Sequence, residues 1–303
     1  MQLNGKQNTE VTELIKRYFI SCPLYSGTNL QTALCRELKM LLWVVLVLDL
    51  GVSAVTLPQI TDEKFIAECV EEHNKARSAV RPPANDMLYM SWDEALAITA
   101  RAWGKHCDFK HNVHLREVGR MHPTFTSVGE NIWTGYPPNM FSVKSAVQSW
   151  VDEVQDYSYE ENNCTAVCGH YTQVVWARSY KVGCAVVHCP HGVKNFDQSP
   201  GAIFVCNYAP GGNIRGQQPY ATTGNPCSGC KEECDNKLCR NLQRESRKSY
   251  NWAPDWDTDG PRSSVAPTNT FLDILIVRPI AVILTCIAAC VVHYVYPNLF
   301  CYE

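Results

Sequence analysis

Three segments between residues 61 and 154 carry apolar residues at helical spacing, and each predicts an amphipathic helix. The first begins at Thr61, which can cap a helix, and ends before the proline-containing stretch RPPAND. In the second, Ser91 and Glu94 form a capping box ahead of ALAITARAWGKHC. The third is the clearest, and its apolar stripe consists of Val143, Ala146, Val147, Trp150, Val151 and Val154.

Two later segments predict β-strands. VGCAVVHC (182–189) and AIFVCNYAP (202–210) are rich in β-branched residues, which favour strands. The segment between them and the third helix, GHYTQVVW (169–176), is ambiguous, because its composition favours a strand while its position after a glycine also allows a short helix. Helices followed by strands predict a layered α+β domain over residues 58–213.

A hydrophobic segment precedes this domain. In KMLLWVVLVLDLGVSA, a lysine stands ahead of a short apolar run that ends in small residues, which predicts a signal peptide over residues 40–55. Residues 1–39 form a polar extension unlike a signal n-region, so we expect Met40 to be the start and the extension to be absent from the mature protein. An uncleaved signal anchor with a cytoplasmic tail is the alternative.

A second hydrophobic segment, residues 271–297, is long enough to span a bilayer, although Arg278 and Pro279 interrupt it. The tail, residues 298–303, has no lysine or arginine, whereas a cytoplasmic flank normally does. The segment is therefore either a transmembrane helix or a glycolipid-anchor signal cleaved near the small residues Ser263 and Ser264. A polar, proline-dotted stretch, residues 241–270, predicts a stalk in front of it.

The cysteines lie mostly between the two hydrophobic segments, which indicates an oxidising compartment and disulfides. They are Cys69, Cys107, Cys164, Cys168, Cys184, Cys189, Cys206, Cys227, Cys230, Cys234 and Cys239. Within residues 214–240, CSGCKEECDNKLC predicts a small knob stapled by two local disulfides, with a zinc knuckle as the alternative. A net charge of -3 argues against nucleic-acid binding, and Asn163 begins a glycosylation sequon, NCT.

Four ionisable residues stand in or beside apolar stretches and are candidates for a functional site: His111, Glu130, Glu153 and His170. An unpaired buried charge is costly, so each glutamate needs a partner. Two histidines and two glutamates could converge as a metal site or as an acid/base pair, or satisfy one another as a structural network. Neither HExxH nor GxSxG occurs, so no local motif supports hydrolase chemistry and no catalytic residue is assigned.

Six motifs in order give the chain a resemblance to a known family. They are CDFKHN, GENIW, WVDEVQDY, GHYTQVVW, KVGCAVVHCP and FVCNYAPGGN. With them, the chain resembles the CAP superfamily of cysteine-rich secretory, antigen five and pathogenesis-related proteins, and most of all its glioma pathogenesis-related branch. The resemblance implies a three-layer α-β-α sandwich in which GHYTQVVW is helical, followed by the small disulfide-stapled knob and the hydrophobic C-terminal segment.

The resemblance also implies a site. It carries the family's cleft tetrad onto His111, Glu130, Glu153 and His170, with the two histidines able to hold zinc or another divalent ion. The implied disulfides are Cys107–Cys189, Cys184–Cys206, Cys227–Cys234 and Cys230–Cys239. Cys69, Cys164 and Cys168 fall outside this pattern, and their odd number leaves one pairing open.

Two functions are compatible with such a site. The first is a binding protein of the secretory pathway, secreted or held at the cell surface by its C-terminal segment, which recognises a lipid, sterol or protein partner. The second is a metal-dependent peptidase or esterase that uses the same cleft. Catalytic zinc usually has three protein ligands, and two histidines fall short of that number. Binding is therefore favoured over catalysis.

Overall fold

The computed structural model describes residues 56–231 and 233–257. The predicted extension, signal peptide, hydrophobic C-terminal segment and tail all lie outside the described residues, as does the second half of the predicted stalk. Within the described part, no helix has the length and apolar character needed to cross a membrane.

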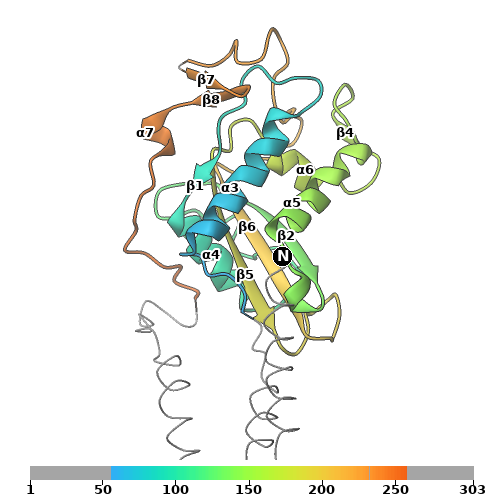
Figure 1. Cartoon of the computed structure of the whole chain (residues 1–303), viewed down its shortest axis with the longest axis vertical. Coiled ribbons are helices and arrows are strands. Elements are labelled where there is room, and N and C mark those ends of the chain that lie inside the picture. The colour runs from blue at the N-terminus through green and yellow to red at the C-terminus, as the bar shows by residue number, and fades with distance from the viewer. Residues whose placement is uncertain (1–55, 232, 258–303) are drawn as a thin grey trace, which may run out of the picture. The chain divides into compact units, whose positions relative to one another are not determined.

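A four-stranded mixed sheet forms the centre of the described domain (Figure 1). Its order is β1 (Ser91–Trp92), β5 (Lys181–Cys189), β6 (Gly201–Ala209) and β2 (Gly129–Gly135). The pair β1–β5 is parallel, and the pairs β5–β6 and β6–β2 are antiparallel. Every residue of β6 is buried, because helices cover both faces of the sheet at this central strand.

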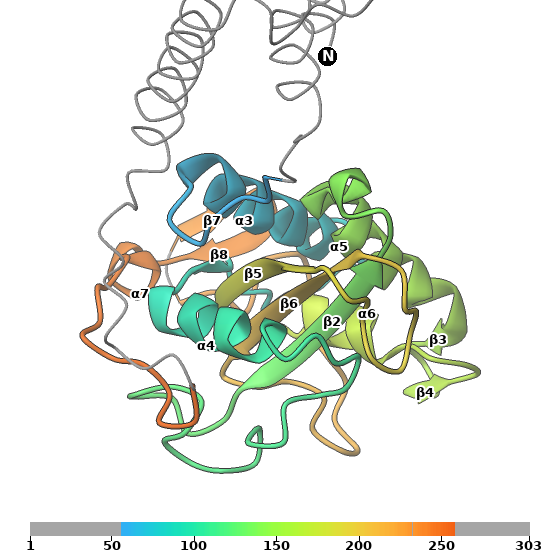
Figure 2. The same ribbon diagram turned by 90° about the horizontal axis from the view of Figure 1, so that it is seen from below.

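Helices pack on both faces of this sheet. Figure 2 shows α3 (Glu63–Ser78) and α5 (Val143–Val151) on one face and α4 (Glu94–Gly104) on the other. The segment predicted as ambiguous is a short helix, α6 (Gly169–Val174), despite its β-branched residues. The α+β fold with helices on both faces of the sheet is thereby confirmed.

The helix ends differ from the predicted ones. Asp62 caps α3, accepting a hydrogen bond from Lys64 N at 2.9 Å, in place of Thr61. Asp93 caps α4, because Ser91 pairs with Lys181 in the sheet and so lies too early in the chain to cap the first turn. The third helix ends at Val151 and continues as a 3-10 helix, η2 (Asp152–Asp156).

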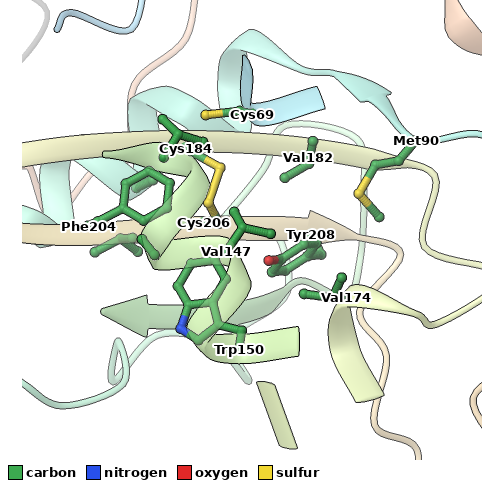
Figure 3. Packing of buried hydrophobic residues seen from close by; sticks show 14 of the residues in the cluster. Cys69, Met90, Val147, Trp150, Val174, Val182, Cys184, Phe204, Cys206 and Tyr208 are labelled. Atoms are coloured by element: carbon green, nitrogen blue, oxygen red, sulfur yellow. A yellow bond between two sulfur atoms is a disulfide. The ribbon is translucent and has the colours of Figure 1, made fainter. Parts of the chain in front are cut away.

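The core lies between the sheet and the pair α3 and α5 (Figure 3). Trp150 stacks on Phe204 with ring centroids 5.5 Å apart. The disulfide Cys184–Cys206 joins β5 to β6 in the same core. Cys69, on α3, is buried there as a free thiol, and burial raises its pKa well above the usual range.

Several short elements complete the described chain. They are η1 (Pro138–Met140), β3 (Tyr157–Ser158), β4 (Asn163–Cys164), β7 (Glu233–Asp235), β8 (Leu238–Arg240) and α7 (Leu242–Glu245). The strands β7 and β8 form a hairpin within the knob, and Cys227–Cys234 and Cys230–Cys239 crosslink it. The knob cysteines are thus held in disulfides, which leaves no thiolate for the zinc-knuckle alternative.

Residues 242–257, expected as the start of a stalk, lie against the domain. Lys181 Nζ donates to Ser246 O at 3.0 Å, and Tyr250 OH donates to Asp93 Oδ2 at 2.9 Å. Further along, Trp256 Nε1 donates to Arg120 O at 2.9 Å. We call residues 242–257 the strap, because these three anchors fasten it to the surface.

A buried histidine in the core makes the fold sensitive to acid. His73 is fully buried, with Nδ1 against Cys69 O at 2.7 Å and Nε2 against Tyr208 OH at 2.8 Å. Burial is the main cause that lowers the pKa of His73 to about 4.

Between pH 6.5 and 4 the unfolded chain therefore binds a proton at residue 73 that the folded chain does not. We expect the free energy of unfolding to fall by roughly 3 kcal/mol from this histidine as pH drops through that window. Urea denaturation at several pH values checks this result. The variant His73→Gln should show a clearly shallower pH dependence, and an unchanged slope would contradict the assignment.

Candidate functional site

Two of the predicted site residues, His111 on a loop and Glu130 on a strand, form a pair. Glu130 lies on β2, and its side chain is completely buried. Its Oε1 atom is 3.0 Å from His111 Nδ1 and accepts a hydrogen bond from Asn112 N at 2.8 Å. The strand thus fixes the carboxylate, and the carboxylate fixes the loop that carries the histidine.

Burial and hydrogen bonding have opposite effects on the pKa values of this pair. Burial is the main cause that raises the pKa of Glu130 above its usual value, against the hydrogen bonds from His111 and Asn112. The hydrogen bond to Glu130 raises the pKa of His111 above that of a free imidazole. The His111 side chain itself is 59% exposed, so this ring faces solvent while its partner does not.

The second pair joins η2 to the start of α6. Glu153 Oε1 is 2.6 Å from His170 Nδ1. Its other oxygen, Oε2, accepts from His170 N at 2.9 Å and from Tyr171 N at 3.2 Å. The Trp150 ring stacks beside the imidazole of His170 at a centroid distance of 6.2 Å. This carboxylate therefore satisfies the free N–H groups of the first turn of α6 while it orients the ring.

A strand residue connects the two pairs. Asn131 follows Glu130 on β2, and its Nδ2 atom donates to His170 O at 3.0 Å. The structure thus brings His111 to Glu130 and Glu153 to His170, and it ties the second pair to the strand of the first. Among residues 56–231 and 233–257, no group of three or more histidine, cysteine or acidic side chains is placed to hold a metal ion. The single cleft and the metal ligation by His111 and His170 stay predictions.

The donor set has a definite chemistry. In both pairs the glutamate carboxylate contacts Nδ1 of the histidine ring. Among the described contacts, Nε2 of each ring is not occupied and is the atom that could bind a further ligand. A carboxylate on the second ring nitrogen is what orients metal-binding histidines in proteins and increases their basicity. Each pair therefore presents a histidine nitrogen of the kind that binds a divalent ion.

Two asparagines that support the site were missed in the sequence. Asn131 holds His170, as described above. With its amide oriented so that both polar atoms are satisfied, the buried Asn207 donates to Glu130 Oε2 at 3.3 Å and accepts from Ala100 N at 3.1 Å. Both asparagines interrupt apolar strands, in ENIW and FVCNYA, and a buried amide in such a strand signals a partner on the neighbouring strand.

The other histidines near the core have structural roles. His122 is buried, and its Nε2 lies 3.0 Å from Asp93 Oδ1. His114 lies 3.0 Å from Glu117 Oε1 and stacks on Trp256. These contacts hold a helix cap and the strap, so neither histidine joins the candidate site.

The described cysteines form five disulfides. The structure contains Cys107–Cys189, Cys184–Cys206, Cys227–Cys234 and Cys230–Cys239, the same pairs that the resemblance implies. Cys164 pairs with Cys168, which leaves Cys69 as the free thiol among the described cysteines. Asn163 is exposed in β4, and its glycosylation stays a prediction.

The fold and the site define a class of disulfide-crosslinked α-β-α domain that carries two histidine–glutamate pairs, and such disulfides are typical of oxidising compartments. The family model described as "Cysteine-rich secretory protein family" (CAP) matches residues 70–208. The chain belongs to this family. The name of the family agrees with the prediction that the protein enters the secretory pathway. Attachment to a membrane stays a prediction.

Two curated relatives match most of the chain. GLIPR1-like protein 1 of Bos taurus is 47% identical over 233 residues, covering 76% of this chain and 93% of the relative. Glioma pathogenesis-related protein 1 of Mus musculus is 45% identical over 250 residues, covering 82% of this chain and 91% of the relative. The predicted resemblance is thus confirmed at the level of the family.

Solved structures also match. NaASP2, crystallised with Zn²⁺, has 27% identity and a TM-score of 0.47, covering 59% of this chain and 96% of that chain. The venom allergen-like protein 4 of Schistosoma mansoni has 26% identity and a TM-score of 0.43, covering 55% of this chain and 99% of that chain.

Proposed function

We propose that this chain is an extracellular binding protein that uses a divalent ion, held by His111 and His170, to recognise a lipid, sterol or protein partner. One observation carries the metal part of this proposal. Both imidazoles are held at Nδ1 by a glutamate, at 3.0 Å for His111 and 2.6 Å for His170, which presents Nε2 as the free nitrogen of each ring.

Binding is favoured over hydrolysis by the same donor set. A bound divalent ion would supply a Lewis acid that attracts an oxygen of the partner molecule. Two histidines are one protein ligand fewer than catalytic zinc usually has. Both glutamates are engaged with histidines and backbone N–H groups, so neither stands free as a general base.

The partner and the tether belong to the proposal as well. The exposed face of the His111 ring is the part of the site that a partner reaches first, since its side chain is 59% exposed. We propose that the predicted segment 271–297 holds the protein at the cell surface, either as a span or as the signal for a glycolipid anchor.

Zinc titration of chelator-treated protein tests the metal site. We expect one zinc ion per chain by isothermal titration calorimetry. The variants His111→Gln and His170→Gln should lose this binding, because each removes one of two protein ligands. Glu153→Gln should weaken it by about 10- to 100-fold, the usual effect of losing the carboxylate behind a metal-binding histidine.

The matched control is His188→Gln, since His188 is exposed on β5 and is not one of the four site residues. Its zinc affinity should equal that of the unmodified chain. Zinc binding that survives both His111→Gln and His170→Gln would contradict the proposed site.

A further inference from the structure

A cavity with charged walls lies where the knob meets the sandwich, and none of the histidine–glutamate pairs lines it. Its volume is about 220 Å³. The walls come from three places in the chain: Asp86, Leu88 and Arg178 of the sandwich, Gly229, Cys230, Lys231, Cys239 and Arg240 of the knob, and Arg244 of α7. Because segments far apart in sequence build it, the cavity exists only in the folded, crosslinked protein.

Backbone hydrogen bonds hold the knob in this position. Cys239 N donates to Met87 O at 2.8 Å, and Tyr89 N donates to Cys239 O at 3.0 Å. On the other side of the knob, Gly229 N donates to Asn85 O at 2.9 Å. Cys230 and Cys239, which are joined in a disulfide, both line the cavity. The walls are therefore rigidly docked on the sandwich.

The lining carries more cationic than anionic side chains. Arg178, Lys231, Arg240 and Arg244 face a single lining carboxylate, Asp86. An oxygen of that carboxylate is already engaged, since Asp86 Oδ1 accepts from Ala221 N at 3.0 Å. A concave, positively charged surface raises the local concentration of anions.

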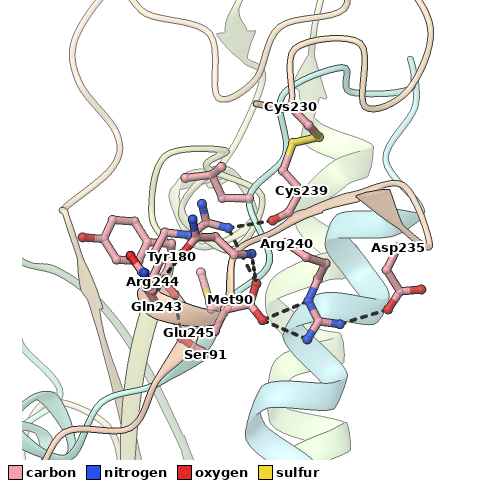
Figure 4. Close-up of polar contacts among 12 residues, drawn as sticks. Met90, Ser91, Tyr180, Cys230, Asp235, Cys239, Arg240, Gln243, Arg244 and Glu245 are labelled. Atoms are coloured by element: carbon pink, nitrogen blue, oxygen red, sulfur yellow. Dashed lines mark hydrogen bonds and ion pairs between the residues drawn. A yellow bond between two sulfur atoms is a disulfide. The ribbon is translucent and has the colours of Figure 1, made fainter. Parts of the chain in front are cut away.

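One of the arginines is fixed by its own partners (Figure 4). Arg240 pairs with Asp235 at 2.9 Å and with Glu245 at 2.8 Å, and its guanidinium lies over the Tyr89 ring at 3.9 Å. Two carboxylates and an aromatic face thus hold Arg240 in place. It shapes the cavity wall and contributes little free charge.

The other cationic side chains of the lining can still donate hydrogen bonds to a ligand. Arg178 and Lys231 are exposed, and no ion pair to either is found among the described residues. Arg244 donates from Nη2 to Cys239 O at 2.7 Å and also lies 3.7 Å from Glu245 Oε1, so its charge is partly compensated. Arg178 and Lys231 are therefore the two lining cations most available to a ligand.

We infer that this cavity binds a tetrahedral oxyanion, the sulfate or phosphate ester group of a small ligand. Arg178 approaches from the sandwich, Lys231 from the knob and Arg244 from α7, so the donors come from three segments. A tetrahedral group offers three oxygens to such donors, whereas a planar carboxylate is matched by the fork of one arginine. The cavity is smaller than the ~300–1,000 Å³ of sites for drug-sized molecules, which fits one ester group and its immediate neighbours.

Calorimetric titration of the full chain with four probes tests this inference. The probes are inorganic sulfate, inorganic phosphate, a sulfated disaccharide and sodium acetate. We expect the sulfated disaccharide or phosphate to bind, with affinity that falls as salt rises, and acetate to bind at least tenfold more weakly. The double variant Arg178→Gln/Lys231→Gln should weaken binding of the tetrahedral probe by about 100-fold, since each charged hydrogen bond accounts for about tenfold.

The matched control is Lys194→Gln/Arg215→Gln, which removes the same charge from two exposed residues outside the lining. It should leave the affinity unchanged. A preference for the disaccharide identifies a sulfated glycan as the source of the group, and a preference for phosphate identifies a phosphate ester. Equal loss of binding in the two double variants, acetate binding as tight as that of the tetrahedral probes, or no binding by any probe would overturn the inference.

Discussion

Replacing Arg77 with alanine is expected to lower the free energy of unfolding by about 5 kcal/mol, at least a third of the ~5–15 kcal/mol that stabilises a typical protein. The Arg77 guanidinium is buried inside the fold and donates to four backbone carbonyl oxygens. It reaches Leu88 O at 2.6 Å, Val174 O at 2.8 Å, Trp176 O at 2.7 Å and Ala177 O at 3.1 Å. Alanine would leave Leu88 O and Val174 O without a donor among the described contacts, at about 1–3 kcal/mol each before any water enters. Trp176 O and Ala177 O would lose one of two donors, since they also accept from Ser179 N and Leu88 N.

The same guanidinium links α3 to the residues that follow α6. Burial lowers the pKa of Arg77 to about 9, which is still high enough to keep it charged at neutral pH. Arg77→Lys keeps the charge but loses the planar fork, so we expect it to recover only part of the lost stability.

Chemical denaturation of the oxidised protein measures this effect. The matched control is Lys75→Ala on the same helix, where the side chain is 63% exposed and its ion pair with Glu72 is a surface contact. Its unfolding free energy should stay within about 0.5 kcal/mol of the unmodified chain. If Arg77→Ala and Lys75→Ala were equally stable, the carbonyl cluster would not be a main support of the fold.

The second large effect is expected at Gly183, where α4 packs directly on β5. A Cβ at this position would lie 2.5 Å from Asp93 O and 2.6 Å from Leu96 C, both backbone atoms of the α4 region. Backbone cannot yield as a flexible side chain does, so the helix would have to move off the strand. We expect Gly183→Ala to cost roughly 3 kcal/mol or more, the upper range of overpacking effects in cores.

Thermal or chemical unfolding of Gly183→Ala beside Gly169→Ala separates overpacking from the general effect of adding a methyl group. At Gly169 the nearest atom to an added Cβ is Asn213 Nδ2 at 3.8 Å, an ordinary contact. Gly169 begins α6, where alanine is tolerated well. The free energy of unfolding of Gly169→Ala should therefore differ from that of the unmodified chain by less than about 1 kcal/mol. Similar losses in the two variants would contradict the close packing of α4 on β5.

Sequence patterns predicted the elements that carry a strong local signal, either an apolar stripe at helical spacing or a run of β-branched residues. The stripe on residues 143–154 identified α5, and the β-branched runs identified β5 and β6. Glu153 differs, because the chain leaves the α-helix at Asp152 and turns into η2, which aims this carboxylate at the first turn of α6. Helical periodicity cannot register such a change of winding.

The strap shows a second limit of sequence reasoning. Residues 241–270 are polar and contain prolines, and that composition is typical of an exposed linker. The signal against it was the presence of Tyr250 and Trp256, since such rings hold a segment to a surface when their O–H or N–H finds a partner. Both do so here, at Asp93 and at Arg120. Those partners are contributed by remote segments, so only tertiary structure reveals them.

For the candidate site, the residues were predicted from the sequence but their pairing was not. Sequence motifs singled out all four ionisable residues, because each interrupts or borders an apolar run. Their grouping into two separate pairs was not predicted, since it depends on the register of β2 against β6 and on the backbone contact between Asn131 and His170. Neither is encoded by local spacing.

The unpaired sulfhydryl of Cys69 has a consequence for how this protein survives in an oxidising environment. Disulfide exchange proceeds through the thiolate, and this thiol on α3 is fully buried in the core and kept protonated by that burial. The native fold thus keeps this internal nucleophile away from the five disulfides of the described residues. Any opening motion that separates α3 from the sheet would expose the Cys69 thiol. The packing of this helix therefore protects the disulfides from exchange.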